Sequence, residues 1–127
     1  MNLPRNMPAN TQFMILLRQP AGGQIPPPDE LAKIMARFSV WMDGLRAKHA
    51  VVGTNGLQYA GRILRGPPGE TVITDGPFTE GKEVIGGYVL VQARSLAAAV
   101  AMAKKCPGLD YRMSVEVRPV QPRPGRK

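Results

Sequence analysis

The sequence predicts an α+β fold in which one antiparallel sheet carries two main helices on one face, the split βαβ or ferredoxin-like arrangement, with an extra β-hairpin. The chain has 127 residues, the size of one ordinary domain with a core of its own. Its apolar residues follow strand-like and helix-like patterns in the order strand, helix, strands with a hairpin, strand, helix, strand. This order is that of a split βαβ unit with its helices on one face of the sheet. We expect a disordered segment over residues 1–11, the domain over 12–120 and a flexible basic tail over 121–127.

The first strand and the loop after it are predicted from local composition. Residues 12–18 contain the apolar run Phe13-Met14-Ile15-Leu16-Leu17, which is typical of a strand buried on both faces. Residues 19–28 are rich in glycine and proline and therefore predict a loop.

A helix is predicted from Pro28 to about Lys48. Proline suits the first helical position, and Asp29 and Glu30 favour the positive end of the helix dipole. The apolar residues that follow recur at helical spacing and form one stripe, with Trp41 alongside: Leu31, Ile34, Met35, Phe38, Met42 and Leu45. We expect this stripe to pack on the sheet.

The middle of the chain reads as strands separated by turns. A second strand begins at residues 50–52, with Gly53 and Gly56 as bulge or turn points, and residues 57–64 continue as strand. The sequence Gly66-Pro67-Pro68-Gly69 predicts a turn. Alternation resumes after it, so we expect a hairpin around residues 62–74.

The last third predicts strand, helix and strand. Residues 86–93 form the clearest strand pattern, and Ser95 is expected to cap a helix that runs through Lys105. The sequence Cys106-Pro107-Gly108 ends this helix. Residues 113–120 predict the final strand.

The sheet is predicted to have both helices on one face, so its other face needs cover. We expect the same face of a second copy to cover it, which predicts a homodimer.

Charge and cysteine content narrow the class of protein. The net charge is +8, from 17 Lys and Arg against 9 Asp and Glu. The basic residues are scattered, so we interpret them as a solvated basic surface and expect no specific nucleic-acid binding. With one cysteine the chain forms no internal disulfide, which fits a reducing compartment. Residues 1–11 lack a long apolar run, so we expect a cytoplasmic protein with no membrane association.

Metal and cofactor sites are not expected. One histidine and one cysteine do not make a zinc site. The glycine pairs Gly22-Gly23 and Gly86-Gly87 match no phosphate-binding fingerprint.

Three separated motifs occur in a distinctive order: Asp75-Gly76-Pro77-Phe78, Gly86-Gly87-Tyr88 and Val115-Glu116-Val117-Arg118-Pro119. In this order they resemble the YCII-related, DGPF-domain family, and the resemblance covers residues 12–120. It implies a fold of the dimeric α+β barrel group, but no particular reaction. Related YCII proteins carry a histidine–aspartate pair near the start of the first helix. This chain differs, since its segment 18–29 offers only Asp29.

Asp75 is the first candidate catalytic residue. A carboxylate beside an apolar strand can act as a general base or proton relay. The competing interpretation is structural, since an aspartate at the start of a turn accepts hydrogen bonds from backbone N–H groups two residues on. Its place in the name-giving motif of the family is compatible with a site role.

Three further residues are candidates for substrate binding: Lys82, Tyr88 and Arg118. Lys82 suits an anionic substrate, although with Glu83 it also makes a plain surface charge pair. Tyr88 and Arg118 are expected to reach a cleft between the sheet and the helices. A tyrosine on a central strand is also common at the edge of a core with its hydroxyl bonded.

His49 and Cys106 are weaker candidates. His49, the single histidine, is interpreted as a surface residue at the end of the first helix. Cys106 follows Lys104 and Lys105, which favour a lowered thiol pKa and a nucleophile. A Cys-Pro-Gly helix stop is mainly a structural signal.

Two functions follow from these residues. The first is a small-molecule enzyme, an isomerase or lyase acting on a small organic acid, with Asp75 as acid or base and its site in the cleft between sheet and helices. The alternative is a non-catalytic ligand-binding or regulatory module. Proteins of the family resemble accessory proteins of extracytoplasmic-function sigma factors, so a sigma factor is the partner in that version.

Overall fold

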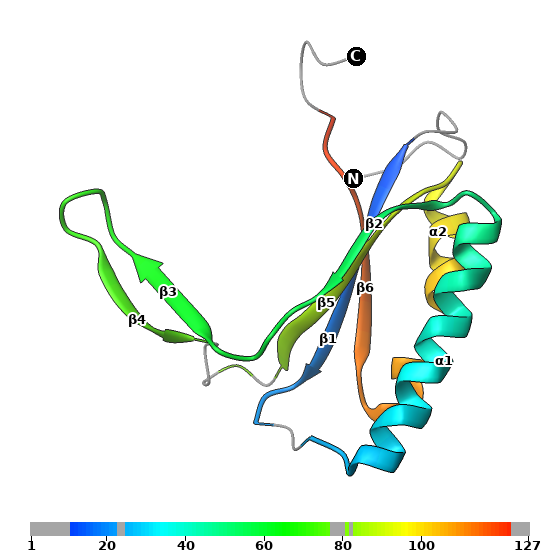
Figure 1. The fold of residues 1–127 in the computed structure, drawn as a ribbon. Coiled ribbons are helices and arrows are strands. Elements are labelled where there is room, and N and C mark those ends of the chain that lie inside the picture. The colour runs from blue at the N-terminus through cyan, green and yellow to red at the C-terminus, as the bar shows by residue number, and fades with distance from the viewer. Residues whose placement is uncertain (1–10, 23–24, 77–80, 82, 123–127) are drawn as a thin grey trace.

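The computed structural model describes residues 11–22, 25–76, 81 and 83–122 and is shown in Figure 1. Residues 1–10 and 123–127, which belong to the predicted disordered segment and basic tail, lie outside the described part. The elements are, in order, β1 (Gln12–Pro20), α1 (Pro28–Ala47), β2 (Val51–Gly56), β3 (Gly61–Arg65), β4 (Val72–Gly76), β5 (Glu83–Gln92), α2 (Leu96–Ala103), the 3₁₀ helix η1 (Pro107–Tyr111) and β6 (Ser114–Pro119).

The main sheet has four antiparallel strands in the order β2-β5-β1-β6. Each outer strand therefore joins a central strand through a helix, with another strand between the two, as the split βαβ prediction requires. Both helices lie on one side of this sheet, which confirms that part of the prediction (Figure 1). The strands β3 and β4 form a separate two-stranded hairpin.

The core lies between the sheet and the helices. Phe13 and Ile15 of β1 sit opposite Val91 and Val89 of β5, and all four side chains are at most 1% exposed. The residues that cover them from the helix layer are Trp41, Met42 and Leu45 of α1 and Ala99 and Ala103 of α2. Since only alternate residues of β1 face this core, the prediction of a first strand buried on both faces is wrong.

The two helices begin as their sequences predict. Proline occupies the first turn of α1, and the Ser95 hydroxyl accepts a hydrogen bond from the Ala98 N–H at 3.0 Å, which caps α2. The indole Nε1 of Trp41 donates to the Met102 carbonyl oxygen at 3.0 Å and joins α1 to the end of α2. The first part of the predicted apolar stripe is not buried, since Met35 is 60% exposed.

The hairpin differs from the prediction in two ways. Residues 57–60 belong to no strand, so β2 and β3 are separate elements rather than one continued strand. Asp75 and Gly76 lie within β4, opposite Arg62 and Gly61, and not in the predicted Asp-Gly-Pro turn. Pro77 and Phe78 of that motif lie outside the described residues.

None of the helices in the described ranges is long and apolar enough to cross a membrane.

Candidate functional site

The side of the main sheet that faces away from the helices carries two of the predicted site residues, Tyr88 and Arg118. Val89 and Val91 of β5 are buried under the helices, so the residues between and before them, Leu90 and Tyr88, point to the opposite side. The same alternation places further side chains there. We call this side the open face: Met14, Leu16 and Arg18 of β1, Tyr88 and Leu90 of β5, and Glu116 and Arg118 of β6.

The strand register orders these side chains into rows across the open face. Met14 lies opposite Leu90 on one side and Arg118 on the other. In the neighbouring row, Leu16 lies opposite Tyr88 and Glu116. The two apolar residues of β1 therefore form a strip with aromatic and aliphatic groups on one side and charged groups on the other.

The charged edge of the open face is built around Glu116. Arg18 donates to its Oε1 from Nε at 3.0 Å and from Nη2 at 2.7 Å. Arg118 is farther away, with its Nε 3.9 Å from Oε2, and its side chain is 69% exposed. Charge-assisted hydrogen bonds of the Arg18 kind are strong and fix geometry. Arg118 is therefore better able than Arg18 to bind an added anion.

The phenol of Tyr88 is held by a neighbouring strand. Asn55 of β2 donates from Nδ2 to the Tyr88 hydroxyl oxygen at 2.9 Å. Because the oxygen accepts this bond, the hydroxyl proton is left to donate elsewhere. The Tyr88 hydroxyl is thus bonded, as predicted, and also equipped to bind an acceptor group.

The structure separates Asp75 from the other candidates. Its carboxylate Oδ1 lies 3.2 Å from Arg62 Nη1 across the hairpin, and its side chain is 92% exposed. The hairpin extends away from the main sheet, on the side opposite the helices (Figure 1). Within one chain, Tyr88 and Arg118 share the open face, and Asp75 lies on a different element.

The structure does not place Tyr88 and Arg118 in a cleft between the sheet and the helices, so that part of the prediction is wrong. Among the described residues, the core around Phe13, Ile15 and Trp41 lies between the sheet and the helices. Tyr88 and Arg118 face away from it, because they alternate with Val89 and Val117, which pack into that core.

Lys82 lies outside the described residues, so its predicted role stays a prediction. Its neighbour Glu83 accepts a hydrogen bond from the Ser114 hydroxyl at 2.6 Å. This bond gives Glu83 a role in joining β5 to the start of β6.

The positions of the two weaker candidates, His49 and Cys106, do not favour a catalytic role. His49 is exposed directly after α1, as predicted, with a positive φ of 56°. Cys106 is only 3% exposed, and burial raises the pKa of its thiol. This direction is opposite to the lowered thiol pKa expected from Lys104 and Lys105, so Cys106 is unsuited to be a nucleophile at neutral pH.

No group of three or more metal-ligating side chains occurs among the residues that the structure describes.

Sequence reasoning missed two charged residues of the open face, Arg18 and Glu116, and also Asn55, which donates to the Tyr88 hydroxyl. The last strand carried a signal for one of them, since Ser114, Glu116 and Arg118 alternate with valines and therefore share a side. The partners across the sheet depend on the register, which a single strand does not show.

The chain is similar to a protein family and to a curated protein. The model of the YCII-related domain matches residues 11–122. An uncharacterized protein of Rhizobium meliloti (strain 1021) is 39% identical over 62 residues, which is 48% of this chain and 50% of that protein. The match thus spans half the length of this relative, whose printed name gives no activity.

Proposed function

Since the chain belongs to the YCII-related domain family, we propose that it is a small-molecule-binding domain that works as a homodimer and holds a small organic anion on the open face. The observation that carries the proposal is the position of Tyr88 and Arg118. They flank the apolar strip of Met14 and Leu16 on a sheet face that neither helix covers.

The ligand class follows from the groups on this face. A guanidinium recognises a carboxylate by paired hydrogen bonds, which suits Arg118. The strip of Met14 and Leu16 suits an apolar body, and the Tyr88 hydroxyl suits an acceptor at the far end. β1 lies between β5 and β6, and Tyr88 and Arg118 belong to neighbouring rows. The two polar ends are therefore two strand spacings and one two-residue step apart, about 12 Å. A short carboxylate with a second polar group matches this span.

The homodimer is proposed because the open face needs cover to hold a ligand away from water. The same face of a second copy supplies this cover with twofold symmetry. The hairpin adds a further argument. Leu64 and Ile73 stand opposite each other on it and are 60% and 62% exposed, and an isolated two-stranded hairpin is only marginally stable in water. We propose that it packs against the second copy.

Ligand binding is favoured over catalysis within one chain. The predicted general base, Asp75, is 92% exposed and paired with Arg62 on the hairpin. An enzyme acting on the same ligand class requires Asp75 of the second copy to reach the open face. The version in which a sigma factor is the partner, and the cytoplasmic location, stay predictions.

The test is a calorimetric titration of the purified protein with a set of short mono- and dicarboxylates. We expect at least one to bind, and Arg118→Gln to weaken it about tenfold or more, because a hydrogen bond to a charged group contributes about 1.5–3 kcal/mol. Arg94→Gln is the matched control, since Arg94 is exposed beyond the end of β5. Binding that is equal in the Arg118 variant, or absent for the whole set, contradicts the proposal.

A further inference from the structure

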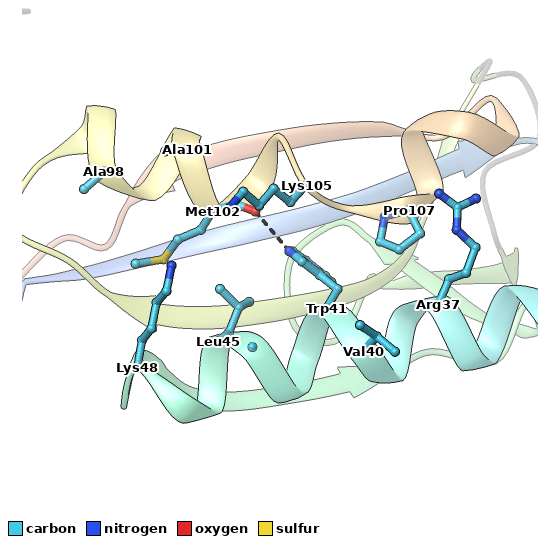
Figure 2. Close-up of a pocket in the computed structure, with 11 residues that line it drawn as sticks. Arg37, Val40, Trp41, Leu45, Lys48, Ala98, Ala101, Met102, Lys105 and Pro107 are labelled. Atoms are coloured by element: carbon cyan, nitrogen blue, oxygen red, sulfur yellow. Dashed lines mark hydrogen bonds between the residues drawn. The ribbon is translucent and has the colours of Figure 1, made fainter.

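A groove on the outer side of the helix layer is separate from the open face. It runs between α1 and α2 and has a volume of about 800 Å³. Figure 2 shows Trp41, Leu45 and Met102 beside it. Trp41 and Leu45 are 7% and 5% exposed and form its floor, while Val40 on its margin is 73% exposed. The groove thus offers an apolar floor and an exposed apolar margin.

Small residues line the groove on both helices. Gly44 of α1 and Ala98 and Ala101 of α2 line it. A Cβ added at Gly44 would meet nothing within 4 Å, so the packing of this chain does not require glycine there. Glycine inside a helix is unfavourable relative to alanine. A glycine that costs stability and faces an open groove is explained by the close approach of another molecule.

The charged residues that line the groove have one sign. Arg37, Lys48 and Lys105 line it, and among the described residues none of its eleven lining residues is acidic. Arg37 is engaged by Asp110 at 2.6 Å and Tyr111 at 2.9 Å. Within the described ranges no ion pair involves Lys48 or Lys105. The two lysines are the cations best able to meet an acidic partner.

We propose that this groove binds an amphipathic helix of a partner protein, with apolar residues along one face and acidic residues along its edges. Arg37 and Lys48 are eleven positions apart in the numbering, so the α1 side of the groove is about 16 Å long, or three helical turns. That length takes apolar anchors at positions i, i+3 or i+4, and i+7 of a docked helix. The lysines then meet carboxylates at its edges.

The same observations disfavour two other occupants. In a twofold contact a second copy would bring the same basic residues, Arg37, Lys48 and Lys105, against this groove, and this like charge opposes its docking there. Nucleic acid binds through phosphates, and its bases need aromatic surfaces to stack on. The floor here has one nearly buried indole, Trp41, among aliphatic side chains.

The test uses a labelled probe peptide of about 18 residues, five helical turns, with leucines along one face and glutamates elsewhere. Fluorescence anisotropy measures its binding. Trp41, the single tryptophan of the chain, reports where it binds through its emission. We expect saturable binding, a change in Trp41 emission, and affinity that falls as salt is added. A peptide of the same composition with the leucines scattered, and one with lysine in place of glutamate, are each expected to bind at least tenfold more weakly, about 1.4 kcal/mol.

Variants locate the site. The double variant Lys48→Glu/Lys105→Glu is expected to weaken the acidic peptide about tenfold or more, and Gly44→Leu to weaken it by filling the groove. Lys33→Glu is the matched control, since Lys33 is exposed on α1 outside the groove, and affinity is expected to stay within about twofold.

Three results overturn the proposal. They are equal binding of the acidic and basic peptides, unchanged affinity in both groove variants, and a Trp41 emission that does not respond to saturating peptide. A change from dimer to monomer in Val40→Glu, seen by sedimentation, also overturns it, because the groove is then an interface between copies.

Discussion

Arg18 and Glu116 are joined across the open face by two hydrogen bonds of 3.0 and 2.7 Å, although 98 positions separate them in the sequence. The bonds link β1 to the edge strand β6 and fix the carboxylate beside Arg118. With side chains 34% and 39% exposed, the pair is only partly shielded from water.

The first prediction concerns the coupling energy of this pair. A double-mutant cycle with Arg18→Ala and Glu116→Ala is expected to give about 1 kcal/mol in urea unfolding, the upper part of the range for exposed pairs. The same cycle on Arg62 and Asp75, whose side chains are 64% and 92% exposed, is expected to give under about 0.5 kcal/mol. Equal coupling in the two cycles contradicts this difference in shielding.

The second prediction separates the two faces of β1. Ile15 is fully buried in the core, so Ile15→Ala is expected to lower the free energy of unfolding by about 2–5 kcal/mol. Leu16 is its half-buried neighbour on the open face. In dilute protein, Leu16→Ala is expected to lower the free energy of unfolding by less than Ile15→Ala does. We also expect Leu16→Ala to weaken the dimer. Urea unfolding and sedimentation at several concentrations measure both effects. A dimer unaffected by Leu16→Ala counts against the open face as its interface.

The third prediction concerns pH and Cys106. Burial raises the thiol pKa in the folded state, so the unfolded chain releases this proton first as pH rises. The stabilisation of the folded state is therefore complete below the ordinary thiol pKa of about 8.5 and declines as pH increases through the folded-state value. Unfolding measured from pH 7 to 10 is expected to show a steeper loss of stability in the natural chain than in Cys106→Ala.

A direct readout accompanies this prediction. Because the thiol is 3% exposed, a thiol-specific reagent is expected to modify the native protein much more slowly than the urea-unfolded protein at neutral pH. Equal rates contradict the buried position.

The fourth prediction concerns Gly44. An added Cβ meets nothing within 4 Å, so Gly44→Ala is expected to stabilise the protein by about 1 kcal/mol through better helix propensity. The measurement is the urea midpoint at constant slope. A loss of stability in this variant contradicts the free space assigned to the groove.

The sequence predicted the α+β arrangement of the single chain because the signals for its helices and strands are local. The proline and acidic residues at the start of α1, the cap at Ser95 and the apolar alternation of β5 each act within a few residues. Asp75 was misplaced for the same reason. Its Asp-Gly-Pro surroundings favour a turn, whereas its position is set by pairing with Arg62 in another strand.

The candidate site was predictable only in part. Tyr88 and Arg118 were selected for their chemistry, and the structure places them on one face. The contact of Arg18 with Glu116, and that of Asn55 with Tyr88, depend on which strands are neighbours and in what register. Periodicity within a strand does not contain that information.

Binding of a small organic anion to the open face can be observed residue by residue with nuclear magnetic resonance. Isotope-labelled protein is titrated with the tightest-binding short carboxylate, and the shifts of its backbone amides are followed. We expect the shifts to concentrate at Leu16, Tyr88 and Arg118. Shifts that concentrate instead around Trp41 and Met102 in the helix layer, or no shifts at all, would contradict it.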